Sequence, residues 1–244
     1  MSRKLRVGID IDEVLRAKWL QFDRFYSQEF GEEYTPKYVW DFFKEYPWKE
    51  VVEIEKELKE PEDMPADINP LDYQIDEKLG EAPADIFLFK KAEEKRLTAR
   101  EVYNRFMYQD FVFELHASAT AMYRGMDLHV NNFYFKYKDC AEFIVISQEN
   151  QFSIPSTLSF LSKIRSRFSN YKFVNKFIDK WDGIDILITT DPDILKGGVP
   201  WGKKLVKLIR PYNENIGKGS LDALQINDLI DNKEFEKIIK YKNK

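Results

Sequence analysis

The sequence has few cysteines and histidines, the side chains that most often form disulfides, bind metal ions or act in covalent catalysis. Its one cysteine, Cys140, excludes an intrachain disulfide and a cysteine-rich zinc site, which favours a reducing compartment. We expect Cys140 to pack as a small apolar group. The two histidines, His116 and His129, have no partner pattern typical of a metal site or a catalytic dyad. We therefore interpret both as structural residues.

Long apolar runs and a strong net charge are also lacking. No run approaches the roughly 20 residues of a membrane span. The basic start, MSRKLRV, is followed by an apolar stretch that Asp10 and Asp12 interrupt, whereas a secretory signal needs an uninterrupted one. A net charge of -4 gives no bulk attraction to phosphate backbones. We expect a soluble, cytoplasmic protein that binds neither membranes nor nucleic acids directly.

Apolar and aromatic residues are plentiful in the 244 residues. With 43% hydrophobic residues the chain can bury a sizeable core, as one large domain or as a core domain with a smaller one. Aromatic residues make up 15%, which suggests that some of the rings lie on a surface that another molecule covers.

Short apolar runs alternate with helical patterns along the chain. Such alternation predicts an α/β fold with a doubly wound parallel sheet. Strands are predicted at 5–11, 141–147, 171–177, 183–189 and 203–209, and helices within 17–58, near 91–113, at 117–137 and at 156–168.

The long helical stretch after the first strand is predicted to be an insertion over the carboxyl edge of the sheet, where ligands bind. We therefore expect a core of residues 1–16 and 114–219 and a helical cap of residues 17–113. Residues 60–87 carry four prolines and nine acids against one lysine, which indicates an acidic arm within the cap. Residues 220–244 are predicted to form a basic C-terminal helix.

Two acids stand directly after the first predicted strand, in the segment GIDIDEVL. Asp10 and Asp12 would repel each other unless a cation or hydrogen-bond donors held them, so the pair suggests a Mg²⁺ site. The alternative is a solvated turn in which Asp12 caps the next helix.

These residues resemble the first motif of the haloacid dehalogenase (HAD) superfamily. Ser147, at the end of FIVIS, resembles the second motif, and DILITTDPDIL with the later RPYN resembles the 5'(3')-deoxyribonucleotidase branch. TPKYVWDFF is similar to a cap segment of that branch. The resemblance covers roughly residues 5–45 and 141–216. It implies a HAD-like fold in which Asp10 attacks phosphorus, Asp12 is the general acid and Ser147 hydrogen-bonds the phosphoryl group.

The fourth motif departs from this pattern. Thr189 and Thr190 stand where the branch has adjacent aspartates, the first of which completes the Mg²⁺ coordination. A neutral hydroxyl is a poor ligand for a hard dication. Asp191 is the candidate substitute, which gives a metal set of Asp10, Asp12 and Asp191, and Asp193 is a poorer candidate.

The third motif requires a lysine that neutralises charge around the nucleophile. Lys176 and Lys180 both precede the 183–189 strand, neither of them at a persuasive spacing. We take Lys180 as the candidate, with a surface position as the alternative.

Two functions are compatible with these patterns. The first is a HAD-fold protein with weak or no catalysis that serves as a subunit of a larger assembly. The Lys-, Asn-, Tyr- and Phe-rich composition resembles proteins of AT-rich phages, so a virion component is one such case. The alternative is a Mg²⁺-dependent phosphomonoesterase acting on nucleoside monophosphates through an aspartyl-phosphate.

Charge is unevenly spread in a way that suits self-assembly. Residues 60–87 carry a net charge of -8, and residues 196–244 carry eleven basic and six acidic residues, a net charge of +5. The acidic arm of one copy could dock on the basic end of a neighbour. The alternative is that both segments are solvated surface.

Overall fold

The computed structural model describes residues 3–30, 112–149 and 151–240. The chain divides into two compact units, one formed by Met1–Gln21 with Phe111–Lys244 and the other by Phe22–Asp110. The predicted cap and its acidic arm at 60–87 fall almost entirely outside the described residues. Apart from residues 22–30, the described residues belong to the first unit.

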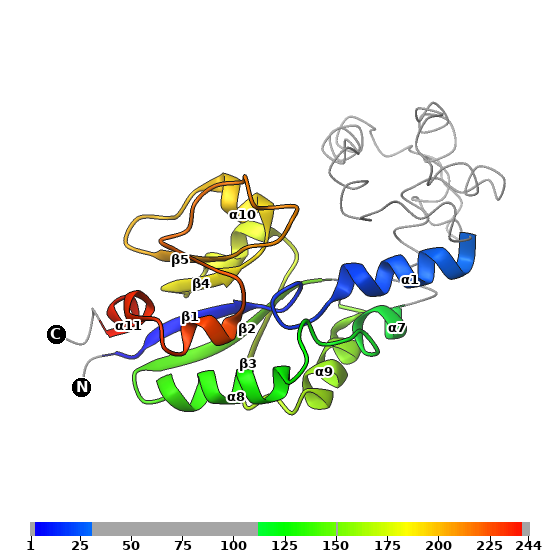
Figure 1. The fold of residues 1–244 in the computed structure, drawn as a ribbon, viewed down its shortest axis with the longest axis horizontal. Helices are drawn as coiled ribbons and strands as arrows, with labels where there is room; N and C mark the ends of the chain where they lie inside the picture. Colours follow the sequence, from blue (N-terminus) through cyan, green and yellow to red (C-terminus); the bar gives the residue numbers. More distant parts are fainter. Residues whose placement is uncertain (1–2, 31–111, 150, 241–244) are drawn as a thin grey trace, which may run out of the picture. The chain divides into compact units, whose positions relative to one another are not determined.

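A six-stranded parallel sheet forms the centre of this unit (Figure 1). The strand order is β3-β2-β1-β4-β5-β6, so the chain winds outward from β1 in both directions. The α/β class and the doubly wound parallel sheet predicted from the sequence are confirmed. The strands are β1 (Leu5–Asp10), β2 (Ala141–Gln148), β3 (Asn170–Val174), β4 (Ile186–Thr189), β5 (Lys204–Leu208) and β6 (Leu221–Ala223).

Helices cover both faces of the sheet (Figure 1). One face packs on α8, α9 and α11 through residues such as Phe133, Phe160 and Phe235, and the other packs on α10 and η2 through residues such as Ile194 and Trp181. The described helices are α1 (Lys18–Phe30), α7 (Val112–His116), α8 (Met126–Tyr137), α9 (Ile154–Lys163), α10 (Pro192–Gly197) and α11 (Lys233–Lys240), with 3-10 helices η2 (Phe177–Trp181) and η3 (Ile226–Leu229). No described helix is long and apolar enough to cross a membrane.

The central strand needs a glycine at one point. A Cβ on Gly8 would lie 2.6 Å from the Ile146 Cδ1 atom and 3.1 Å from side chains of two further core residues. A larger residue at this position would therefore require the side chain of Ile146 to move. Asp10, the first candidate site residue, ends this closely packed strand.

Two predicted helices begin later than the sequence pattern suggested. The helix predicted at 117–137 begins at Met126, because Gly125 before it adopts a left-handed conformation (φ +77°). The tail predicted as a helix from Ser220 first forms β6 and η3, and its helix begins only at Lys233. Leu221 and Ala223 alternate with an exposed Asp222 and pair with β5, which explains the strand.

Candidate functional site

The candidate residues gather at the carboxyl edge of the sheet. β1 pairs with both β2 and β4, so the ends of these three strands lie side by side. This arrangement brings Asp10, Ser147 and Thr189 to one edge, although they are far apart in sequence. Such an edge is where ligands bind in open α/β sheets.

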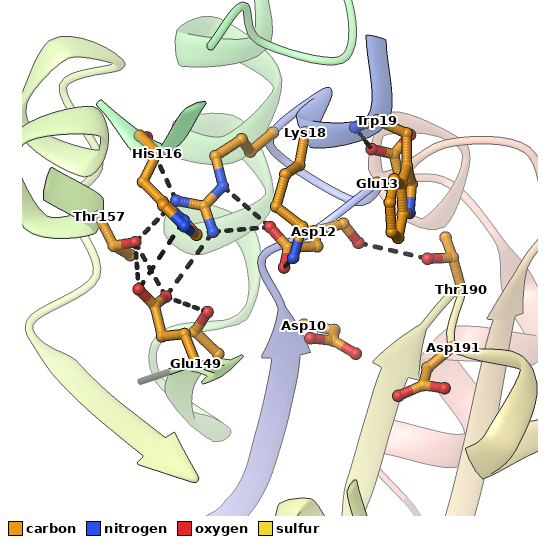
Figure 2. Close-up of polar contacts among 12 residues, drawn as sticks. Asp10, Asp12, Glu13, Lys18, Trp19, His116, Glu149, Thr157, Thr190 and Asp191 are labelled. Atoms are coloured by element: carbon orange, nitrogen blue, oxygen red, sulfur yellow. Dashed lines mark hydrogen bonds and ion pairs between the residues drawn. The ribbon is translucent and has the colours of Figure 1, made fainter. Parts of the chain in front are cut away.

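Lys180 occupies the centre of the β4 side of this edge. Its Nζ atom donates hydrogen bonds to Asp10 Oδ2 and to Asp191 Oδ2, each at 2.7 Å. The lysine is only 4% exposed, so the alternative of a surface position is wrong. Lys176, by contrast, is exposed at the start of η2. Figure 2 shows the carboxylates of Asp10 and Asp191 beside the ends of β1 and β4.

Thr189 completes this group. Its hydroxyl donates to Asp10 Oδ2 at 2.7 Å and accepts from the Asp191 N–H at 3.0 Å. Asp191 is also the N-cap residue of α10, and its Oδ1 accepts from the Asp193 N–H at 2.9 Å. The capping bond and the contact with Lys180 thus use different oxygens of Asp191. Asp193 itself is exposed in the first turn of α10.

In the group of Lys180, Asp10 and Asp191, one positive side chain faces two acidic ones. Burial raises the pKa of Asp10 above its ordinary value, and Lys180 only partly offsets the effect, while Asp191 adds to it. Burial would lower the pKa of Lys180, but Asp10 and Asp191 together raise it above the ordinary value. The ammonium is therefore firmly charged and holds two carboxylates, of which Asp10 carries its charge at a cost.

Asp12 lies on the other side of β1 and has different partners. Its Oδ1 accepts from Arg16 Nε at 2.9 Å and from Arg16 Nη2 at 2.7 Å, and its Oδ2 is ion-paired with Lys18 (Figure 2). Burial alone would raise the pKa of Asp12, but the two cations outweigh it and hold the pKa below the ordinary value. Asp12 is therefore an ionised partner of two cations.

Ser147 belongs to a buried network that sequence reasoning missed. Its hydroxyl donates to the carboxylate of Glu149, which also accepts from Thr157 Oγ1 at 2.8 Å. Arg16 is fully buried, and its Nη1 atom donates to Thr157 Oγ1 at 2.7 Å. The Nδ1 atom of His116 lies 3.9 Å from Glu149. Figure 2 shows Glu149, Thr157 and His116 together on this side of β1.

Two sequence signals could have located this network. Asp12 and Arg16 have the four-residue spacing at which opposite charges meet in a helical turn. Glu149 follows Ser147 by two residues at the end of β2, where a side chain also lies near the carboxyl edge. The RPYN segment likewise braces the site, since Asn213 Nδ2 donates to the Thr190 carbonyl at 2.9 Å and Arg210 Nε donates to the Glu13 carbonyl at 2.9 Å.

Glu13 is a second unusual acid in the loop after β1. It adopts a left-handed conformation (φ +58°), and its Oε1 accepts from the Trp19 N–H at 2.9 Å. Burial raises the pKa of Glu13 to about 7, and the charge of Asp12 adds to the effect. A non-glycine residue in this conformation is strained, so the surrounding contacts must hold the loop in place.

The predicted Mg²⁺ ligands are not arranged around one open position. Lys180 lies between Asp10 and Asp191, and both oxygens of Asp12 contact protein cations instead. Among the residues that the structure describes, no group of three acidic, histidine or cysteine residues could hold a metal ion. The side chains as placed here therefore do not fit a resident dication, which needs several anionic oxygens facing it.

Similarity to known proteins is confined to solved structures. No protein-family model matches the chain, and no curated protein matches it in sequence. The chain is similar to a haloacid dehalogenase-like hydrolase from Burkholderia xenovorans, an L-2-haloacid dehalogenase and a haloacid dehalogenase-like family hydrolase from Xanthomonas campestris, each at 12% identity. These similarities cover 95%, 93% and 100% of this chain and 97%, 98% and 99% of the others, with TM-scores of 0.46, 0.46 and 0.45.

Proposed function

We propose that this chain is a HAD-like protein that does not perform phosphoryl transfer and that serves as a subunit of a larger assembly. The observation that carries the first half is the double ion pair of Asp12 with Arg16 and Lys18. A general acid must hold a proton at working pH. Asp12 has a lowered pKa and is deprotonated at neutral pH, so it has no proton to give to a leaving group.

Two further contacts support this proposal. The Ser147 hydroxyl already donates its hydrogen bond to Glu149, so it cannot donate one to a phosphoryl oxygen. The side chain of Asp10 is 4% exposed, and its Oδ2 accepts from Lys180 and Thr189. Each group that the resemblance assigns to catalysis is thus engaged by a partner within the protein.

The assembly half of the proposal is supported by exposed apolar side chains. Trp201 is fully exposed, and Phe152, Leu224 and Leu128 are each at least 60% exposed. Trp201 in particular is a large apolar side chain with no cover among the described residues, and interfaces are enriched in such residues. The opposite net charges of residues 60–87 and 196–244 point to a second copy of the chain as the partner.

A specific observation favours the alternative, a Mg²⁺-dependent phosphomonoesterase acting on nucleoside monophosphates. Asp10, Lys180 and Asp191 converge at one edge of the sheet, as a charge-neutralised nucleophile would require. The two functions therefore differ in a measurable requirement for Mg²⁺.

A phosphate-release assay separates the two functions. The purified full chain is incubated with deoxynucleoside monophosphates and Mg²⁺, alongside the Asp10→Asn variant. We expect both proteins to be equally inert. Phosphate release by the wild type that Asp10→Asn abolishes would refute the proposal and establish the phosphomonoesterase.

The oligomeric state tests the assembly half. Size-exclusion chromatography with light scattering should show the wild-type chain as an oligomer. A variant that lacks residues 62–84 and, separately, Trp201→Ser should each shift it toward the monomer. A wild type that is monomeric at all accessible concentrations, or oligomers unchanged in both variants, would contradict self-assembly through these features.

A further inference from the structure

Helix α8 has a second apolar face, on the side away from the sheet. Its inner side packs on one face of the sheet (Figure 1) and consists of Met126, Val130, Phe133 and Tyr137. Leu128 and Phe135 lie on the opposite side and are 60% and 52% exposed. Because they are seven residues apart, they lie two turns apart along one face of the helix. The outer face of α8 thus presents two large apolar side chains to solvent.

One flank of this outer face carries an exposed charge near each end. Asp127 lies in the first turn of α8, and Lys138 is its C-cap residue. Both share a helix row with Asn131, whose Nδ2 atom donates to the Arg165 carbonyl at 3.3 Å, just after the end of α9. The Lys138 Nζ atom lies 5.3 Å from the centre of the Phe135 ring, beside the apolar face. Neither charge has an oppositely charged partner among the described residues.

This pattern selects one way of pairing two copies of the helix. In an antiparallel pair with a two-fold axis, Leu128 lies level with the partner's Phe135, and Asp127 lies near the partner's Lys138 on the same flank. A parallel pair would instead place equal charges beside each other, and these repel. The outer face of α8 is therefore complementary to itself, as a two-fold interface requires.

The length of α8 sets the expected strength of such a contact. A helix of 12 residues is about 18 Å long. One face of it offers less than the roughly 800 Å² per partner that stable interfaces bury. We therefore expect a weak pairing that depends on protein concentration and adds to other contacts in an assembly.

We propose that the outer face of α8 is a two-fold interface on which a second copy of this chain packs its own α8 in the antiparallel orientation. The inference rests on the proposed function, because it names a surface through which the assembly forms. It uses neither Trp201 nor the acidic residues 60–87. Pairing removes Leu128 and Phe135 from water and gives both exposed charges of the flank a partner.

Disulfide cross-linking of the full-length chain tests the pairing. Asn132 is exposed midway along α8, near the expected two-fold axis, so the cysteine introduced by Asn132→Cys would meet its own copy. Under mild oxidation we expect about tenfold more covalent dimer from this variant than from Ser159→Cys, an exposed position of α9. Wild type, whose one cysteine is Cys140, should form as little dimer as Ser159→Cys.

Charge exchange in the Asn132→Cys chain tests the orientation. Lys138→Glu places two acids near each other on the shared flank, once for each copy of the pair, and should lower the rate of cross-linking about fivefold. Adding Asp127→Lys to Lys138→Glu should restore the rate, because opposite charges then meet again. If the double exchange cross-links as slowly as Lys138→Glu alone, the antiparallel interface is wrong.

Removal of an apolar side chain tests the packing in the same Asn132→Cys chain. Leu128→Ser should slow cross-linking, since the partner's Phe135 then loses its apolar contact. Ile178→Ser is the matched control, because Ile178 is 53% exposed but belongs to η2 on the other face of the sheet. Equal rates in Leu128→Ser and Ile178→Ser would overturn the inference.

These results are distinguishable from a failure of the proposed function. A wild type that forms oligomers, combined with no excess cross-linking of Asn132→Cys over Ser159→Cys, would refute the inference and leave the assembly half of the proposed function standing. Phosphate release by the wild type, combined with the expected cross-linking, would refute the catalytic half of the proposed function and support the inference.

Discussion

The two sides of β1 hold buried or partly buried carboxylates in opposite electrostatic conditions. On the β2 side, Asp12 and Glu149 are matched by two cations, Arg16 and Lys18. On the β4 side, Asp10 and Asp191 share the single cation of Lys180. One region is balanced in charge, and the other carries one negative charge more than its cations compensate.

The pKa directions follow this difference. The pKa of Asp12 is held below its ordinary value by Arg16 and Lys18, which outweigh the effect of burial. The pKa of Asp10 is raised, because burial outweighs the attraction of Lys180 and Asp191 adds repulsion. Ionised Asp12 therefore stabilises the fold, whereas ionised Asp10 costs stability. The two acids of a single DxD motif thus have opposite roles, which the motif alone does not reveal.

The largest loss of folding stability should come from removing Arg16, a cation on the charge-balanced β2 side of β1. Arg16→Met leaves the buried Glu149 and the partly buried Asp12 with only Lys18, and breaking a largely buried ion network in this way costs about 3–5 kcal/mol. For a chain of this size we expect the melting temperature to fall by roughly 10 °C. Urea unfolding and calorimetry measure both quantities.

Arg167→Met is the matched control, since Arg167 is exposed and its loss should change stability by less than about 0.5 kcal/mol. If Arg16→Met costs no more than this control, the network does not hold the loop and the distinction between the two sides disappears.

The sequence predicted the sheet and its functional edge but not the partners of the site residues. Strands β1, β2, β4 and β5 are buried runs of β-branched and aliphatic residues, and such patterns are local. Asp10, Ser147 and Thr189 could be placed because each stands at the end of such a strand. Parallel pairing then brings these ends together without further information.

The positions of Lys180 and Arg16 could not be predicted in the same way. Lys180 lies in a short 3-10 helix with no periodic pattern, and its partner Asp10 is 170 residues away in sequence. Lysine and arginine are rarely buried, so the sequence favoured a surface position for Lys180 and gave Arg16 no role. Only the three-dimensional structure shows that both are buried counter-ions.

The second-largest change in stability is expected at Glu13, in the loop after β1. It tests whether a buried acid without a matched cation lowers the stability of the fold. The carboxylate of Glu13 accepts from a backbone N–H, and its pKa is raised by burial from 4.5 to about 7. The wild type should therefore lose stability as the pH rises from 4.5 to about 7. Glu13→Gln keeps an acceptor for the Trp19 N–H and should be more stable than wild type by about 2 kcal/mol above that range.

Unfolding measured at several pH values checks this prediction. The gain of Glu13→Gln should vanish below pH 4.5, where the unfolded chain also protonates Glu13. A gain of the same size at acidic and alkaline pH would assign the effect to shape rather than to charge, and Glu13 would then not belong with Asp10 as an uncompensated acid.

The smallest change in stability should come from substituting Asp10, the residue that would be the nucleophile of an active phosphatase. Both donors to Asp10 contact one oxygen, so the side-chain amide oxygen introduced by Asp10→Asn can accept from Lys180 and Thr189 as before. The change removes a charge that burial penalises and leaves Lys180 paired one-to-one with Asp191. We expect stability at neutral pH to change by less than about 1 kcal/mol, and in the favourable direction.

We expect Asp12→Asn, in the same motif, to change the folding stability in the opposite direction from Asp10→Asn. Because the pKa of Asp12 is lowered, its ionised form contributes stability above pH 3.8 that is lost as the pH falls, so Asp12→Asn should be less stable than wild type at neutral pH and approach it in acid. The raised pKa of Asp10 predicts that any advantage of Asp10→Asn appears only as the pH rises above 3.8. Equal losses in both variants at neutral pH would mean that the two sides of β1 are balanced alike. Opposite signs would mean that the chain keeps Asp12 for stability and carries Asp10 at a cost, which a protein without phosphoryl transfer tolerates only while Lys180 stays in place.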